Sequence, residues 1–323
     1  MHVWEIAGLR AEPRLAGRDV PLAAQGEALV RVAAVGLNFA DLLMIEGKYQ
    51  VRPPLPFVPG MEFSGVVEAL GPGTTGPPPG TRVLGICGTG GLAERLCIAA
   101  DRIAPLPDAM GFDEAAGFPI AYGTSHLALT LRARLQPGET LLVTGAAGGV
   151  GLTAVEIGKR LGARVIASAR GAERLGVAKA AGADVLVDSD APDLRDALRA
   201  LGGVDVVYDA VGGPAFDAAL RACKPDGRLL AIGFASGQVP QVPANLLLVK
   251  NLTVSGFWYG GYQDHAPKTV ADGMAELLRW RATGTLHPHI GHVLPFADFP
   301  EGLALLRDRK ATGKVVIRVN QQP

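Results

Sequence analysis

The sequence is poor in cysteine, and this scarcity excludes two kinds of architecture. Three cysteines occur in 323 residues, Cys87, Cys97 and Cys223, and no two of them form a Cys-x-x-Cys pair. An odd number of scattered cysteines supports neither a disulfide framework nor a thiolate zinc site. We therefore expect each of them to be a small, buried apolar residue.

The sequence also lacks an excess of charge of either sign, and it lacks long hydrophobic runs. Lysine and arginine together number 31, and so do aspartate and glutamate, so the formal net charge is zero. Proteins that bind nucleic acids or anionic membranes usually carry an excess of positive charge. No apolar run reaches the roughly 18 residues that suggest a membrane span, and the first residues show no basic stretch followed by an apolar one. These absences predict a cytoplasmic protein without a membrane or nucleic-acid partner.

Histidine is scarce except near the C-terminus, where His287, His289 and His292 lie close together. Zinc needs several nitrogen or sulfur ligands that converge, and such a trio is one way to provide them. However, Pro288 and Gly291 interrupt the trio, and the alternation of His287 with His289 is typical of a strand. We expect no metal here.

Glycine, in contrast, is abundant, and its most informative cluster lies in the segment 140–170. The apolar run TLLVT (140–144) is followed within seven residues by Gly145, Gly148, Gly149 and Gly151. Apolar residues then recur at helical spacing from Val150, and a second apolar run occupies 163–168. This order of strand, glycine-rich turn, helix and strand brings backbone N–H groups and a helix N-terminus to a phosphate. It predicts a dinucleotide site.

The end of the second strand indicates which dinucleotide binds. NAD-binding units place an Asp or Glu there to bind the ribose 2′-hydroxyl, whereas this chain has Ser168 and Arg170, with Arg174 one helical turn further on. A guanidinium can hold a 2′-phosphate through two parallel hydrogen bonds, so the pattern favours NADPH. The alternative is that both arginines are solvated charges at a helix start, and the intervening Glu173 supports that alternative.

The rest of the chain divides into two patterns. Strand-like runs alternate with helical patterns at 140–144, 164–168, 184–188, 204–209, 228–233 and 252–257. This alternation predicts an α/β fold with a doubly wound, parallel, six-stranded Rossmann sheet. Residues 1–120 instead contain short β runs punctuated by Gly and Pro, which predict a small antiparallel, barrel-like domain. We expect domains at 1–122 and 123–262, and a segment 263–323 that returns to the first domain.

This order of parts resembles the zinc-free quinone oxidoreductase branch of the medium-chain dehydrogenase/reductase superfamily, which includes ζ-crystallin. The resemblance covers essentially the whole chain and depends on the motifs VGLNFADLLMIEGKY (35–49), PFVPGMEFSGVV (56–67), AAGGVG (146–151), VYDAVGG (207–213) and GKVVI (313–317). It implies a GroES-like β-barrel catalytic domain, an NADP-binding Rossmann domain and a homodimer. The apolar run at 252–257 is expected at an edge of the sheet, where it would favour the same dimer.

Two departures from the zinc alcohol dehydrogenase pattern are informative. Those relatives carry a cysteine ligand in the segment matching 38–41, which here reads Asn-Phe-Ala-Asp, and a histidine ligand at the position of Met61. Without Lewis-acid zinc, alcohol oxidation loses its means of stabilising an alkoxide. The resemblance therefore implies reduction of an electron-poor acceptor, either a quinone or an enone-type C=C.

The resemblance also implies roles for individual residues. Asn38 and Tyr49 are the catalytic candidates, although a turn-capping asparagine and a half-buried core tyrosine remain alternatives. The candidates for cofactor binding are Asn38 and Thr124 at the nicotinamide, Gly148, Gly149 and Val150 at the pyrophosphate, Ser168, Arg170 and Arg174 at the 2′-phosphate, and Gly233, Phe234, Phe257 and Trp258 at strand ends facing the ligand. For the aromatic residues among them, ordinary core packing is the alternative.

Two other functions remain open. An enoyl-thioester reductase of the acyl-CoA type would need basic residues for a phosphorylated substrate tail, and the candidates are Lys48, Arg52, Lys250 and Lys268. A non-enzymatic structural or RNA-binding role, as some ζ-crystallin relatives have, is the alternative from another class. Zero net charge and the absence of an aromatic-basic recognition motif count against RNA binding.

Overall fold

The computed structural model describes residues 1–320, which belong to two compact units. The first unit consists of Met1–Ile120 and the chain from Pro288 onward, and the second consists of Ala121–His287. The sequence analysis placed the first boundary at 122/123 and assigned 263–287 to the returning segment, whereas these residues lie in the second unit. Contacts within that unit include one between Glu276 and His126, whose Oε2 and Nε2 atoms lie 3.1 Å apart.

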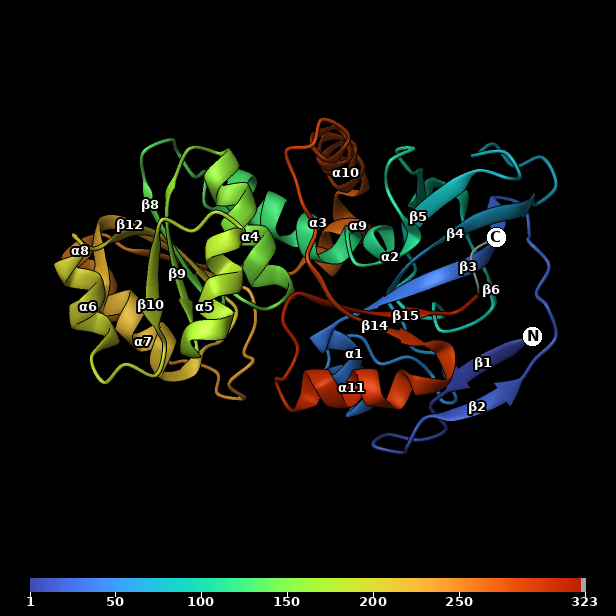
Figure 1. Ribbon diagram of the computed structural model, residues 1–323, viewed down its shortest axis with the longest axis horizontal. Coiled ribbons are helices and arrows are strands. Elements are labelled where there is room, and N and C mark those ends of the chain that lie inside the picture. The colour runs from blue at the N-terminus through green and yellow to red at the C-terminus, as the bar shows by residue number, and fades with distance from the viewer. Residues whose placement is uncertain (321–323) are drawn as a thin grey trace. The chain divides into compact units, whose positions relative to one another are not determined.

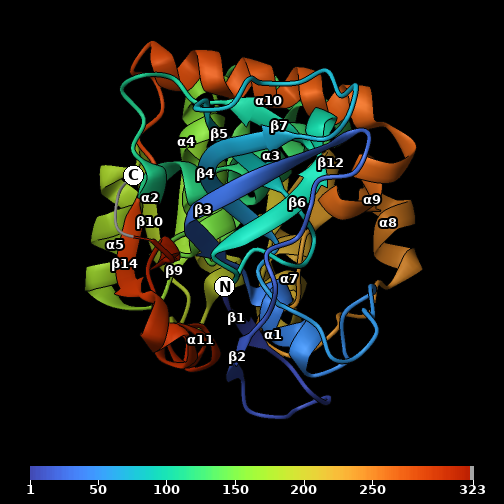
Figure 2. The ribbon, with the colours of Figure 1, turned by 90° about the vertical axis from the view of Figure 1, so that its right-hand side faces the viewer.

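Strand β3 (Glu27–Leu37) is the centre of the first unit. It pairs along its length with β4 (Glu62–Leu70), and its other edge pairs first with β6 (Arg95–Ala99) and then with β15 (Lys314–Arg318), as Figure 2 shows for β4 and β6. The seven-stranded sheet is completed by β5 (Arg82–Ile86), β7 (Ile103–Pro105) and β14 (Ile290–Pro295). All of its pairings are antiparallel except β14 with β15.

The other elements of this unit cover its apolar core. They are β1 (His2–Glu5), β2 (Arg14–Gly17), α1 (Phe39–Ile45), α2 (Phe112–Ala116), α11 (Phe299–Arg307) and two 3-10 turns at 100–102 and 296–298. Strand residues Val30 and Phe63 are fully buried, and the ring of Trp4 packs on Phe299 with centroids 5.5 Å apart. The sheet and its core form the small β domain that the sequence predicted.

The second unit contains the predicted parallel sheet, with strand order β10-β9-β8-β11-β12-β13. Its strands are β8 (Thr140–Thr144), β9 (Arg164–Ala169), β10 (Val185–Asp188), β11 (Val204–Asp209), β12 (Cys223–Ala231) and β13 (Thr253–Gly256). The helices are α3 (Pro119–Leu127), which continues into a π-helical turn at 128–132, α4 (Gly149–Arg160), α5 (Gly171–Ala180), α6 (Leu194–Ala200), α7 (Gly213–Ala222), α8 (Ala244–Lys250), α9 (Tyr259–His265) and α10 (Pro267–Ala282). Figure 1 shows helices α4 to α8 around the sheet.

Alternation along the strands divides the helices between the two faces of this sheet. Leu142 and Val207 pack with Phe216 of α7 and Leu198 of α6 in one core. On the opposite face α4 lies so close to β8 that a Cβ added at Gly158 would be 2.5 Å from the Leu141 side chain. Helices on both faces and a strand order that reverses between β8 and β11 define a doubly wound sheet, which places ligands at the carboxyl ends of these two strands.

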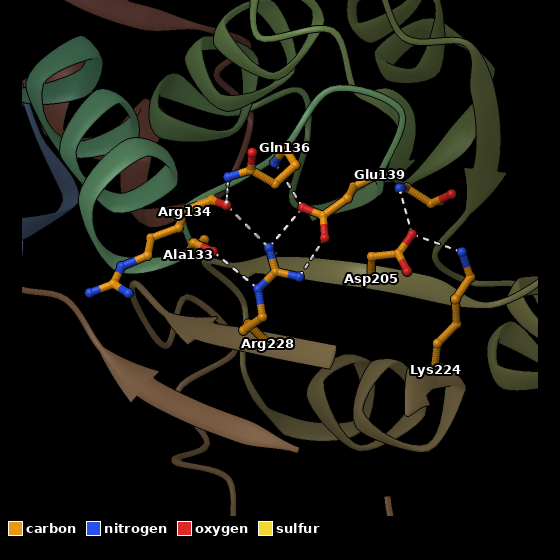
Figure 3. Close-up of polar contacts among 8 residues, drawn as sticks. Ala133, Arg134, Gln136, Glu139, Asp205, Lys224 and Arg228 are labelled. Carbon is orange, nitrogen blue, oxygen red and sulfur yellow. Dashed lines mark hydrogen bonds and ion pairs between the residues drawn. The ribbon is translucent and has the colours of Figure 1, made fainter. Parts of the chain in front are cut away.

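Charged groups hold the amino-terminal ends of three strands of this sheet together (Figure 3). Arg228 of β12 donates from two nitrogens to the carboxylate of Glu139, at 2.7 Å each, and from Nε to the carbonyl of Ala133 at 3.0 Å. Asp205 of β11 accepts from the Thr140 N–H at 2.8 Å and from Lys224 at 2.7 Å. These bonds lie at the edge opposite to the carboxyl ends, so they fix the sheet without occupying the ligand edge.

Strand β13 lies at an edge of the sheet, as predicted, and pairs only with β12 among the described residues. The preceding helix α8 leaves two large apolar side chains in solvent, Leu248 at 79% and Val249 at 72% exposed. None of the helices between residues 1 and 320 is long and apolar enough to cross a bilayer.

Candidate active site

The glycine-rich turn after β8 forms the phosphate-binding geometry that the sequence predicted. Gly145 has a positive φ of 63°, and helix α4 begins at Gly149 after the N-cap residue Gly148. A Cβ at Gly151 would lie 2.2 Å from the Gly145 carbonyl oxygen, so only glycine permits the helix to pack this closely on the turn. A Cβ at Gly148 would lie 3.3 Å from the Gly145 carbonyl oxygen, a tight contact that also favours glycine at the helix N-terminus. Backbone N–H groups there suit a pyrophosphate.

The carboxyl end of β9 carries the residues predicted to select the cofactor. Ser168 is buried, and its hydroxyl has no hydrogen-bond partner within the described part of the chain. Arg170 is the N-cap residue of α5, and its side chain is 57% exposed. An unpaired buried hydroxyl beside an exposed guanidinium is what an absent polar ligand would leave, so this end of β9 fits the adenosine ribose of a dinucleotide.

Two carboxylates near Arg170 were missed by the sequence analysis. Asp188 ends β10 opposite Ala169, and it accepts from the N–H groups of Gly171 at 3.4 Å and Asp190 at 3.0 Å. Asp190 pairs with Arg170. Both aspartates are visible in the sequence, in the stretch DVLVDSD (184–190). However, Asp190 lies beside β9 only because β9 pairs with β10, and the local sequence pattern does not predict that pairing.

The four residues predicted at later strand ends differ in exposure. Gly233 and Phe234 follow β12, and Phe257 and Trp258 follow β13. Phe257 is buried and packs on Tyr262 with ring centroids 5.2 Å apart, whereas Phe234 and Trp258 are each 39% exposed. Phe257 therefore has a packing role, and the two exposed aromatic rings remain candidates for ligand contacts.

Helix α3 fixes most of its polar side chains by hydrogen bonds. Tyr122 donates to Glu156 at 2.5 Å, and the Ser125 hydroxyl lies 3.0 Å from the Tyr208 hydroxyl. Burial raises the pKa of Glu156. Thr124 is buried on the same helix, with 7% of its surface exposed. Thr124 stays the α3 candidate for a ligand contact.

In the first unit the predicted Asn38 belongs to a buried polar cluster. Asn38 precedes α1, and its backbone N–H donates to Asp41 at 2.9 Å. Its side-chain Nδ2 donates to Glu62 at 2.9 Å, and Lys314 Nζ donates both to Asn38 Oδ1 and to Glu62 at 2.7 Å each. Sequence analysis did not identify Glu62 or Lys314 as site residues, because they are 252 positions apart. Each of the two residues lies within a motif on which the family resemblance depends, and nothing else in the sequence pointed to them.

This cluster provides a test of whether the chain can hold the zinc of its zinc-dependent relatives. Asn38 and Met61 stand where those relatives carry ligands, and the carboxylate of Glu62 is already occupied by an ammonium group. Cys87 donates to the Gly60 carbonyl at 3.2 Å, and burial raises the pKa of its thiol, which disfavours the thiolate that zinc requires. Within residues 1–320, no three His, Cys, Asp or Glu side chains lie together so as to hold a metal ion. The residues present do not fit zinc.

Tyr49 lies in the irregular segment after α1, as predicted. Its backbone N–H donates to the Leu43 carbonyl at 3.1 Å, and its half-buried ring packs against the core of the first unit. The ring therefore has a packing role in the first unit, independently of any catalytic role of the hydroxyl.

Comparisons with known proteins agree with this geometry. Residues 24–108 match the family model for the alcohol dehydrogenase GroES-like domain, and residues 149–278 match the model for zinc-binding dehydrogenases. The quinone oxidoreductase-like protein 2 homolog of Nematostella vectensis is 39% identical over 92% of this chain and 83% of the relative.

Solved structures extend the similarity to the whole fold. The quinone oxidoreductase of Thermus thermophilus, whose structures include a complex with NADPH, is 37% identical, with a TM-score of 0.88 over 99% of this chain and 100% of that one. The Escherichia coli quinone oxidoreductase in complex with NADPH is 27% identical, with a TM-score of 0.91 over 99% and 100% of the two chains. The chain belongs to the quinone oxidoreductase branch of the medium-chain dehydrogenase/reductase superfamily, and its class is that of the oxidoreductases.

Proposed function

We propose that the protein is an NADPH-dependent reductase that transfers a hydride to a quinone or to an enone-type C=C without zinc. The observation that carries the proposal is the end of β9, where Ser168 and Arg170 stand in place of the acidic residue of an NAD site. Structures of two similar quinone oxidoreductases contain NADPH, which supports the same cofactor here.

Each part of the proposed cofactor site has a chemical role. The N–H groups at Gly148, Gly149 and Val150 would bind the pyrophosphate, and Arg170 and Arg174 would bind the 2′-phosphate beside Ser168. Thr124 and Asn38 would hold the nicotinamide, and Phe234 and Trp258 would border the ligand. NADPH supplies the hydride when it is bound, and the protein positions it and excludes water.

The proposed substrate class follows from the chemistry that the first unit lacks. A quinone or enone accepts a hydride without a Lewis acid because its own carbonyl groups delocalise the negative charge. An alcohol would need a metal or a strong base at its hydroxyl, and the cluster around Glu62 offers neither, since Lys314 neutralises the carboxylate. Tyr49 is the proposed donor to the acceptor oxygen.

The structure weakens the thioester alternative. Lys250 donates to the carbonyls of Arg221 and Cys223 at 2.9 and 2.8 Å, and Lys268 pairs with Asp272. These lysines already have acceptors, which makes them less suited to a phosphorylated tail. The non-enzymatic alternative has no structural feature in its favour.

A panel of acceptors tests the proposal. NADPH oxidation is followed with simple quinones, enones, enoyl thioesters and alcohols plus NADP⁺ under identical conditions. We expect turnover with a quinone or an enone and none with alcohols. Turnover restricted to enoyl thioesters would favour the alternative, and absence of NADPH binding would overturn the proposal.

A further inference from the structure

Asp209 is a carboxylate buried at the ligand edge of the parallel sheet, and the proposed cofactor site gives it no role. It ends β11, and in the register of the sheet it lies opposite Thr144, the last residue of β8. The two residues are 0% and 1% exposed. Because the strand order reverses between β8 and β11, both lie at the point where such sheets bind ligands.

Neutral groups of neighbouring residues hold the Asp209 carboxylate. The Thr144 hydroxyl donates to Oδ1, and it accepts from the Ala210 N–H at 3.3 Å. The N–H of Gly212 donates to Oδ2 at 2.9 Å, and that of Val211 donates to Oδ1 at 3.4 Å. Burial raises the pKa of this carboxyl, and the hydrogen bonds oppose the shift. Since neutral donors offset the cost of burying a charge less than a cation does, stability alone is a poor reason for a carboxylate here.

The hydrogen bonds of Asp209 extend to three turns at this edge of the sheet. Thr144 directly precedes the glycine-rich turn after β8. Gly212 belongs to the turn after β11 and is the N-cap residue of α7. The backbone carbonyl of Asp209 accepts from the N–H groups of Ile232 and Gly233, at 2.8 and 3.3 Å, directly after β12. One residue thus connects the turns that follow β8, β11 and β12.

The glycine-rich turn is the one that the proposed function uses for the pyrophosphate. A Cβ at Gly145 would lie 3.0 Å from the Val211 side chain, so this turn packs closely on the turn after β11. The Gly145 carbonyl accepts from the Gly148 N–H at 2.9 Å, and α4 begins at the next residue. A displacement of Thr144 would therefore be passed on to the N–H groups at the start of α4.

We propose that Asp209 and Thr144 are positioning residues, whose hydrogen bond holds the glycine-rich turn where its N–H groups meet the pyrophosphate of the cofactor. The inference rests on the proposed function and deepens it. Asp209 acts through its neighbours, because it is shielded from solvent and its oxygens accept hydrogen bonds from the chain. The motif VYDAVGG (207–213) thereby acquires a role in cofactor binding.

The test removes each side of this hydrogen bond. Thr144→Val keeps the shape of the side chain and loses the hydroxyl, whereas Thr144→Ser keeps the hydroxyl as a conservative rescue. Asp209→Ala removes the acceptor, and the double variant shows whether the two side chains act as a unit. Should Asp209→Ala fail to fold, Thr144→Val decides. The control is Thr140→Val, the same substitution at a buried position of β8 but at the opposite end of the strand.

Affinity is measured for 2′-phospho-ADP-ribose, which contains the pyrophosphate, and for adenosine 2′-monophosphate, which does not. An unfolded fraction weakens both equally, so the ratio of the two dissociation constants reports the pyrophosphate contact independently of stability and of turnover. We expect Thr144→Val and Asp209→Ala to lower the preference for 2′-phospho-ADP-ribose about fivefold or more, the size of one hydrogen bond. The double variant should lose no more than the weaker single variant, and Thr144→Ser and Thr140→Val should keep the ratio within twofold.

The outcomes separate this inference from the proposed function. A lower melting temperature of Thr144→Val with an unchanged ratio would show that the bond only stabilises the fold, and would overturn the inference. An equal loss of the ratio in Thr140→Val would overturn it as well. If the unmodified protein binds both fragments but reduces no acceptor, the proposed reaction fails, while the ratio still decides the role of Asp209 and Thr144. If it binds neither fragment, both fail.

Discussion

Arg170 and Asp190 form an ion pair at the carboxyl end of β9, with 3.2 Å between Arg170 Nε and Asp190 Oδ2. Their side chains are 57% and 60% exposed, so the pair contributes little to stability. A 2′-phosphate carries more charge than the carboxylate and offers the guanidinium two parallel bonds. The pair is therefore expected to open when NADPH binds.

Arg170→Ala should weaken NADPH binding and leave NADH binding nearly unchanged. Charge-assisted hydrogen bonds of this kind are worth about 1.5–3 kcal/mol, roughly a ten- to hundredfold change in the dissociation constant. Fluorescence titration with both cofactors measures the effect. Arg195→Ala is the matched control, because Arg195 pairs in the same way with exposed Asp196. Equal titration curves for NADPH and NADH with the unmodified protein would contradict the assignment.

The purified protein should contain no stoichiometric zinc and should keep its activity in the presence of chelators. The reason is the ligand set around Asn38, Met61 and Glu62, in which an ammonium group occupies the carboxylate. Elemental analysis checks this, and a value near one zinc per chain would refute it.

The protein should be a homodimer, with β13 and α8 at the interface. Among residues 1–320 the strand β13 pairs on one edge only, and Leu248 and Val249 of α8 are exposed. Leu248→Asp/Val249→Asp should shift the mass in light scattering from dimer to monomer at micromolar concentration. Leu22→Asp is the control, because Leu22 is 90% exposed in the first unit. A monomeric unmodified protein would count against this prediction.

Tyr49→Phe should lower turnover tenfold or more, equivalent to roughly 1.4 kcal/mol, if the hydroxyl donates to charge that develops on the acceptor oxygen. The melting temperature should change little, because the variant keeps the ring and its packing on the core. If Tyr49→Phe keeps full turnover on the best acceptor, the hydroxyl has no catalytic role. A large drop in melting temperature with normal turnover would assign Tyr49 to the core.

The stability of the protein should depend on Asp41 between pH 4 and 7. Burial raises the pKa of Asp41 to about 6, although the N–H groups of Asn38 and Gly60 oppose the shift. Since the folded pKa lies above the unfolded one, the native state binds the proton more tightly, and this stabilisation is lost as the pH rises through about 6. Asp41→Asn should be less stable throughout, but the gap to the unmodified protein should narrow by up to about 3 kcal/mol between pH 4 and 7. A gap independent of pH in urea unfolding would contradict the shifted pKa.

The sequence was most informative where secondary structure is continuous and the signal is local. The runs at 140–144 and 204–209 coincide with β8 and β11, and the helix after the glycine turn begins within one residue of the first apolar position. Such segments satisfy their hydrogen bonds with near neighbours or in a regular sheet, so periodicity alone identifies them. The short elements α1, β1, β2 and β7 were missed, since runs this brief are fixed by tertiary packing.

Strand β12 begins earlier than predicted, although its continuous pairing with β11 starts at Arg228. The stretch Lys-Pro-Asp-Gly at 224–227 is typical of a turn, and the strand was predicted to start at 228. The structure includes these residues in β12, with a register shift between Val204 and Val206 of its partner β11, and Asp226 takes a φ of 62°. The register with β11 passes from Val204–Cys223 to Val206–Arg228, so residues 224–227 form an irregularity that keeps the turn preference inside the strand. The polar cluster of Asn38, Glu62 and Lys314 likewise could not be predicted from the sequence, because only the folded sheet brings β15 beside β3.

The position of β15 in the first unit affects how the chain folds during its synthesis. Residues 1–120 complete their sheet only when Val315–Arg318 pair with β3, and about 190 further residues must be synthesised before then. At about 5–20 residues per second this interval lasts roughly 10–40 s. Throughout it the nascent first unit lacks the β15 pairing at residues 34–37 of β3, and its interior carboxylate, Glu62, lacks its cation, while the second unit is itself still being synthesised. We expect the incomplete first unit to be more prone to aggregation until β15 has paired with β3.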